Sequence, residues 1–167
     1  KRWLEVGKHK DRGKFDSKIV RHRTMLKEYF MFGCNIGMRI GEMRIMRWRD
    51  VTFERTKEGK RYLRVRVSTK TKTGKWKRRT AIGRASAYNA LVRLRESRED
   101  NLKESDYVFC KPDGTPVSHF REGFDTLLRL ASEYIPKDGT PIDCQYDTDY
   151  EKYTPYCMRH TYITYQL

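Results

Sequence analysis

Positive charge is concentrated in residues 55–84, and the pattern of that segment is typical of β-strands. It holds 13 Lys or Arg side chains and one acid, whereas residues 85–167 hold 10 basic and 14 acidic groups. Leu63, Val65 and Val67 alternate with cationic or polar residues. This period of two predicts a strand with one buried face and one cationic face. The cationic face of this strand is expected to be its outer face.

A β-hairpin follows from the same segment. We expect strands over 61–69 and 76–82, joined by a turn at Thr73-Gly74. Its tip carries Lys70, Lys72 and Lys75. Residues 50–54, closed by Glu58-Gly59, are expected to add a third strand.

Helices are expected elsewhere in the chain. Apolar spacing predicts one helix through Met25 to Phe30 that ends at Gly33, one through Ile36 to Met46 that ends before Asp50, and one through Ala87 to Leu94. A fourth begins with Ser118 as its cap and continues through Phe120 and Phe124, and a last one starts at Thr154-Pro155 and still runs at Leu167. The expected fold is α+β, a mainly helical domain with a small three-stranded antiparallel sheet.

The composition indicates which class of molecule the chain binds. The 167 residues have a net charge of +15. A pI near 9.8 favours a polyanion, with nucleic acid ahead of an anionic membrane. A mean hydropathy of −0.91 argues against a membrane span. The cysteines Cys34, Cys110, Cys144 and Cys157 lack metal-ligand spacing, so we expect a reduced, cytoplasmic protein without zinc.

The domain organisation is expected to be simple. Residues 1–17 form a basic linker or remnant, and residues 18–167 form one domain. The acidic stretch 136–153 is too polar for a core element and is expected to be a loop or insertion.

Three separated segments carry candidate chemistry. In the first, Arg39 begins a helix and Glu42 follows one turn later, where it can hold the guanidinium; an ordinary surface ion pair is the alternative. The second is the hairpin tip, which could equally be a solubilising turn. In the third, Tyr156 and Arg159 share a face at the start of the last helix. The alternative interpretation of this segment is a polar helix start without a chemical role.

The order and spacing of these segments resemble the catalytic domain of tyrosine recombinases, the phage integrase family. The resemblance spans about residues 18–167. The matching residues are Gly37, Arg39, Glu42, Met46, Trp48, Asp50 and Val51, then Thr71 to Lys75, and finally Met158, Arg159, His160 and Thr161.

The resemblance implies a site-specific recombinase that acts on double-stranded DNA without a metal or cofactor, in bacteria or phage. A tyrosine attacks a phosphodiester and forms a 3′-phosphotyrosyl intermediate. Arg39 and Arg159 stabilise the phosphate, Glu42 supports Arg39, and Lys72 is the general acid, with Lys70 and Lys75 as rivals. DNA-binding residues are Lys70, Lys75, Lys77 and Arg78.

The sequence departs from the family pattern in two ways. Tyr156 stands where the family usually has histidine, and we expect the adjacent His160 to be structural, buried or hydrogen-bonded behind the site. The resemblance implies a nucleophilic tyrosine several dozen residues after the Arg159 segment, and this chain ends eight residues after Arg159. Tyr162 and Tyr165 share a helix with Arg159 and are interpreted as packing residues. The 167 residues alone are therefore expected to be monomeric and inactive, whereas intact relatives act as tetramers on DNA.

Two other functions remain open at this stage. A non-catalytic protein could hold the DNA backbone through the hairpin and the basic N-terminus. A type IB topoisomerase shares the site chemistry.

Overall fold

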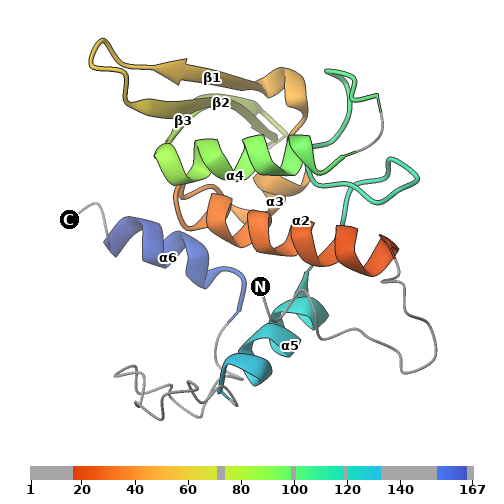
Figure 1. Ribbon diagram of the computed structural model, residues 1–167. Coiled ribbons are helices and arrows are strands. Elements are labelled where there is room, and N and C mark those ends of the chain that lie inside the picture. The colour runs from red at the N-terminus through yellow and green to blue at the C-terminus, as the bar shows by residue number, and fades with distance from the viewer. Residues whose placement is uncertain (1–16, 71–73, 99–100, 119, 133–153, 165–167) are drawn as a thin grey trace.

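An antiparallel sheet and a group of helices make up the computed structural model, which describes residues 17–70, 74–98, 101–118, 120–132 and 154–164 (Figure 1). The predicted α+β class is confirmed. In chain order the elements are α2 (Ser17–Gly33), α3 (Ile40–Arg44), the 3₁₀ turn η1 (Trp48–Asp50), β1 (Val51–Arg55), β2 (Arg61–Lys70), β3 (Trp76–Gly83), α4 (Ala85–Glu96), α5 (Arg121–Ser132) and α6 (Cys157–Thr164).

The sheet has the order β1-β2-β3, with both pairs antiparallel. Its register pairs Val65 of β2 with Val51 on one side and with Ala81 on the other. Leu63, Val65 and Val67 are buried, whereas the residues between them are exposed. The predicted hairpin and third strand are confirmed, because the alternation of side chains already specified which face is buried.

Helix α4 covers the buried face of the sheet and lies between the sheet and α2 (Figure 1). Its residues Ala87, Ala90, Leu91 and Leu94 are buried, at the spacing of one helical face. The core therefore has the sheet on one side and α2 on the other. In the described part of the chain, the opposite face of the sheet is turned toward solvent.

An ion pair between a buried carboxylate and a partly exposed guanidinium joins α2 to α4. The Glu28 side chain is 1% exposed, and its two carboxylate oxygens accept hydrogen bonds from Nε and Nη2 of Arg93 at 3.0 and 2.7 Å. This hydrogen bonding raises the pKa of the Arg93 guanidinium. Lys27 Nζ lies 3.2 Å from the same carboxylate. The pair fixes how α4 sits on α2 in an otherwise apolar contact.

Three helix boundaries differ from the sequence prediction. The helix expected from Ile36 to Met46 shrinks to α3, since Gly37 adopts a φ of 64° that ends any regular helix there. The fourth helix begins at Arg121 rather than after Ser118. Its start is set by tertiary packing, because the Phe120 ring lies 4.4 Å from that of Tyr29 and the Phe120 carbonyl accepts the first helical bond, from Phe124.

The last helix also starts later than predicted. Residues 154–156 form a tight turn in which Cys157 N–H donates to the Thr154 carbonyl at 2.9 Å, and α6 begins at Cys157. Thr154 and Pro155 therefore precede the helix by one turn of 3₁₀ type.

Some expectations concern residues that the structure does not describe. The basic linker 1–17, except Ser17 itself, and the acidic segment 136–153 lie outside the described residues, as does the end of the chain from residue 165. Among the residues that are described, no helix combines the length and apolarity needed to cross a membrane.

Removing Arg93 tests the ion pair between α2 and α4. We expect Arg93→Met to lower the free energy of unfolding by about 2 kcal/mol, because it leaves the buried Glu28 carboxylate without its two-point partner. Arg95→Met on the same helix changes an exposed side chain and should stay within about 0.5 kcal/mol of wild type. Urea unfolding of both variants makes the comparison, and equal stabilities would contradict it.

Candidate active site

The site is built around the residues from Gly37 to Glu42, which include the end of the α2–α3 link and the start of α3. Gly37 has a left-handed backbone with a φ of 64°, and Arg39 is extended immediately before α3. The Glu42 carboxylate accepts a hydrogen bond from the Arg39 backbone N–H at 2.9 Å through Oε2. This contact caps the start of α3 and fixes the position of the Arg39 main chain.

Glu42 binds two guanidinium groups from different elements. Glu42 is only 4% exposed. Nη1 of Arg39 lies 3.4 Å from Oε1, and Nη2 of Arg79, on β3, lies 2.5 Å from Oε2. The side chains of Arg39 and Arg79 are 60% and 41% exposed, so both cations remain accessible to an anion in solvent. The predicted contact of Glu42 with Arg39 is present.

Helix α6 brings Arg159 to the same segment. Nη1 of Arg159 donates to the Gly37 carbonyl at 2.5 Å, across 122 positions of sequence. Two glycines allow this close approach. A Cβ on Gly33 would lie 2.6 Å from Sδ of Met158, and one on Gly37 would lie 2.2 Å from Cδ1 of Tyr162. Met158 and Tyr162, one turn apart on α6, therefore pack directly against the backbone on either side of the turn.

The position of Tyr162 agrees with its interpretation as a packing residue. Its ring covers Gly37, and its hydroxyl lies 3.4 Å from the Ile82 carbonyl on β3. The Arg84 guanidinium also lies over this ring, 5.8 Å from its centroid. Tyr165, the other tyrosine considered from the sequence, lies outside the described residues.

The hairpin strand that carries Arg79 also supplies exposed cations. Lys75, Lys77 and Arg78 are exposed at the start of β3 and just before it. Lys72, the predicted general acid, falls in residues 71–73, which lie outside the described part of the chain, as does the side chain of Lys70. The structure therefore shows the two strands that carry the tip but not the tip itself.

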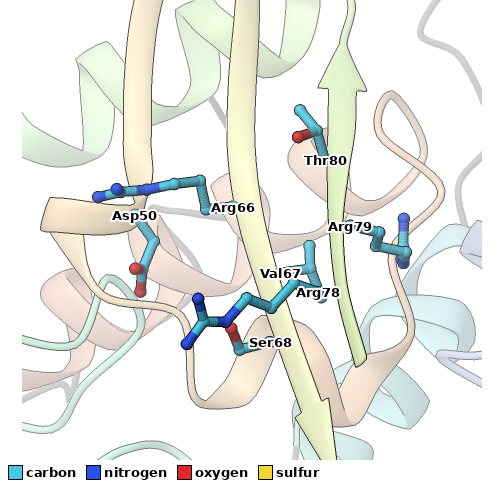
Figure 2. Close-up of a pocket in the computed structure, with 7 residues that line it drawn as sticks. All are labelled: Asp50, Arg66, Val67, Ser68, Arg78, Arg79 and Thr80. Carbon is cyan, nitrogen blue, oxygen red and sulfur yellow. The ribbon is translucent and has the colours of Figure 1, made fainter. Parts of the chain in front are cut away.

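A cation-lined hollow runs across the strands of the hairpin. Figure 2 shows Arg66 and Arg78 on one side of β2, near Asp50 and Ser68, while Arg79 points away on the other side of β3. The hollow has a volume of about 460 Å³. A second hollow of about 320 Å³ shares Asp50, Arg66, Val67 and Ser68 with it and extends to Glu42, Ile45 and Trp76. Arg66 is anchored there, because its Nη2 donates to the Arg49 carbonyl at 2.7 Å.

Tyr156 and His160 lie together at the start of α6. Their ring centroids are 5.3 Å apart in an edge-on arrangement, and both residues are exposed. The expected burial of His160 is therefore wrong, whereas the alternative, a hydrogen-bonded His160, stays a prediction. Successive side chains on a helix point about 100° apart. Because the Arg159 side chain faces Gly37, the side chain of His160 points toward solvent.

Sequence reasoning missed Arg79. It lies among several cations of β3, and charge alone does not distinguish it from Arg78. The signal was in the register: the pairing of Lys70 with Trp76 places Arg79 opposite Val67, on the buried side of the sheet. An arginine at an inward position needs a buried acidic partner, which Glu42 provides. No group of three or more His, Cys, Asp or Glu side chains that could hold a metal occurs among the described residues.

Comparison with known proteins identifies the family. The family model described as "Phage integrase family" matches residues 10–164. Among solved structures, the fold is similar to that of the integrase of the Tn1549 transposon in complex with circular intermediate DNA, with a TM-score of 0.53 and 17% sequence identity. The similarity covers 98% of this chain and 48% of that one, so this chain spans about half of its length. A search of the curated proteins found no match.

The family model covers most of the chain, and the fold is similar to that of an integrase. The chain belongs to the phage integrase family, the tyrosine recombinases.

Substituting Gly37 tests how α6 is held. Gly37→Ala should lower the free energy of unfolding by at least about 3 kcal/mol, because it combines a strained backbone with a clash against Tyr162. Gly59→Ala is the matched control, since Gly59 has a φ of 78° but no atoms near the added Cβ, and it should cost only about 1 kcal/mol. Urea unfolding measures both, and equal decreases would show that the Tyr162 contact is unimportant.

Proposed function

We propose that this chain is the phosphate-binding part of a site-specific DNA recombinase, which breaks and rejoins double-stranded DNA through a 3′-phosphotyrosyl intermediate. The observation that supports the proposal is the hydrogen bond from Arg159 to the Gly37 carbonyl, two residues before Arg39. It joins two arginine segments that are far apart in sequence and that match the family pattern.

The arginines supply what the reaction needs. When a tyrosine oxygen attacks the phosphorus, negative charge builds up on the non-bridging oxygens of a pentavalent transition state. Guanidinium groups remain protonated and can donate to two oxygens at once, so Arg39 and Arg159 stabilise that charge. Holding Arg39 through Glu42, and Arg159 through the Gly37 carbonyl, reduces the reorganisation needed when the phosphate arrives.

The remaining roles belong to the hairpin, to α6 and to a segment outside these residues. Lys72 protonates the departing 5′-oxygen, which would otherwise leave as an alkoxide. Tyr156 donates a hydrogen bond to the phosphate in place of the usual histidine. The nucleophilic tyrosine comes from a segment beyond these 167 residues, and the intact protein acts as a tetramer on DNA.

DNA is the partner that the charge distribution favours. Lys75, Lys77 and Arg78 are exposed at or just before the start of the hairpin strand that also carries Arg79, the partner of Glu42. Each phosphate that they neutralise releases condensed counterions. The structure of the Tn1549 integrase, which has a similar fold, contains DNA.

A nicked DNA substrate tests the chemistry. With the full-length recombinase, we expect a covalent tyrosyl–DNA adduct that Arg39→Ala and Arg159→Ala each reduce by at least about 100-fold, since each removes a fixed donor to the transition state. Arg64→Ala removes a cation paired with Glu54 on β1 and should leave adduct formation near the wild-type level. If wild type binds duplex DNA but forms no adduct, the protein is a non-catalytic DNA-binding protein.

The salt dependence of DNA binding locates the interface. For this chain, replacing Lys75 and Lys77 by Gln should flatten the slope of log affinity against log salt concentration by about 0.9 for each phosphate that is no longer neutralised. Replacing Lys57 and Lys60 by Gln removes the same charge at the β1–β2 turn, at the other end of β2, and should change the slope less. Fluorescence anisotropy at several salt concentrations measures both. Equal slopes in the two variants would place the DNA elsewhere.

A further inference from the structure

Arg79 lies closer to the buried carboxylate than Arg39 does. Its Nη2 lies 2.5 Å from Oε2 of Glu42, whereas Nη1 of Arg39 lies 3.4 Å from Oε1. It reaches this position from β3, where the register puts it opposite the buried Val67. The ion pair therefore ties the hairpin directly to the segment that carries Arg39.

We propose that Arg79 is a positioning residue for Arg39 and acts through Glu42. This inference rests on the proposed function. The Oε2 atom accepts from both Arg79 and the Arg39 backbone N–H, at 2.5 and 2.9 Å. Those two bonds fix the rotation of the carboxylate and leave Oε1 toward the Arg39 guanidinium. At 3.4 Å that last contact orients the guanidinium without binding it tightly.

Charge explains why a second cation is needed. Glu42 is buried, so its carboxylate requires a close positive partner. With Arg79 present, the cluster of Arg39, Arg79 and Glu42 has one positive charge in excess. Among the described residues, Arg39 and Arg79 are the two side chains that form ion pairs with Glu42. If Arg79 is removed, Arg39 is left as the partner of the carboxylate. The guanidinium then closes onto Glu42, and its donors are no longer directed at a phosphate.

A direct contact between Arg79 and DNA is the competing explanation, because its side chain is 41% exposed. The two explanations predict different measurements. A backbone contact contributes to affinity and to its salt dependence. A positioning residue contributes to the rate of the chemical step once DNA is bound.

The first experiment separates rate from affinity in the full-length recombinase. At saturating nicked DNA, Arg79→Met should lower the single-turnover rate of adduct formation by about 10- to 100-fold. The dissociation constant for DNA should rise only a few-fold. Arg79→Lys should recover part of the rate, because an ammonium supplies the charge but only a single-point contact. Arg64→Met, which breaks another cross-strand ion pair, should leave the rate unchanged, and thermal unfolding checks that each variant is folded.

A double substitution gives the sharper test. Glu42→Gln removes the buried negative charge, so Arg39 no longer has to neutralise it. Adding Glu42→Gln to Arg79→Met should therefore raise the rate at least about threefold above that of Arg79→Met alone, whereas two independent structural defects would lower it further. A rate for Arg79→Met equal to wild type, a defect confined to affinity, or no recovery in the double variant would each overturn the inference. In each of those cases the wild-type protein still cleaves DNA, so the proposed function is unaffected. If the wild-type protein does not cleave DNA, the proposed function is overturned as well.

Discussion

The left-handed turn at Gly37 is the constraint on which the site depends. It ends the helical path after α2, so that Arg39 lies at the first position before α3, and its bare backbone leaves room for the Tyr162 ring. Because Tyr162 can approach so closely, Arg159 reaches the Gly37 carbonyl. One glycine thus places both arginine segments side by side, and a side chain there would disturb both at once.

The burial of Glu42 strengthens the charge interactions of the site. A carboxylate with so little exposure interacts strongly with nearby charges, so the number and placement of its cations matter. Two guanidiniums from different elements share it, and each keeps part of its surface in solvent. The result is a pair of oriented cations with a net positive charge, next to hollows lined by Arg66 and Arg78. Such an arrangement suits a phosphodiester better than a single exposed arginine does, because its donors are held before the anion arrives.

The sequence predicted features that depend on neighbouring residues more accurately than features that depend on contacts between distant elements. The strands were predictable because Leu63, Val65 and Val67 alternate with cations, and alternation alone decides which face is buried. The second helix was predicted too long, because its apolar spacing continued through Gly37, where the backbone is left-handed and the Tyr162 ring of α6 packs against it. The start of α5 was misplaced for a similar reason, since Phe120 packs on Tyr29 from a distant helix.

By itself, the sequence determined the hairpin, the cationic surface and the pairing of Glu42 with Arg39, because each depends on residues a few positions apart whose spacing follows from backbone geometry. The order of its motifs also indicated the family. The tertiary structure alone decided that Arg159 meets Gly37, that Arg79 shares Glu42, and that His160 faces solvent. These contacts join residues from separate elements, and their geometry is set by how α6 and the hairpin pack around one turn of backbone, which no local spacing encodes.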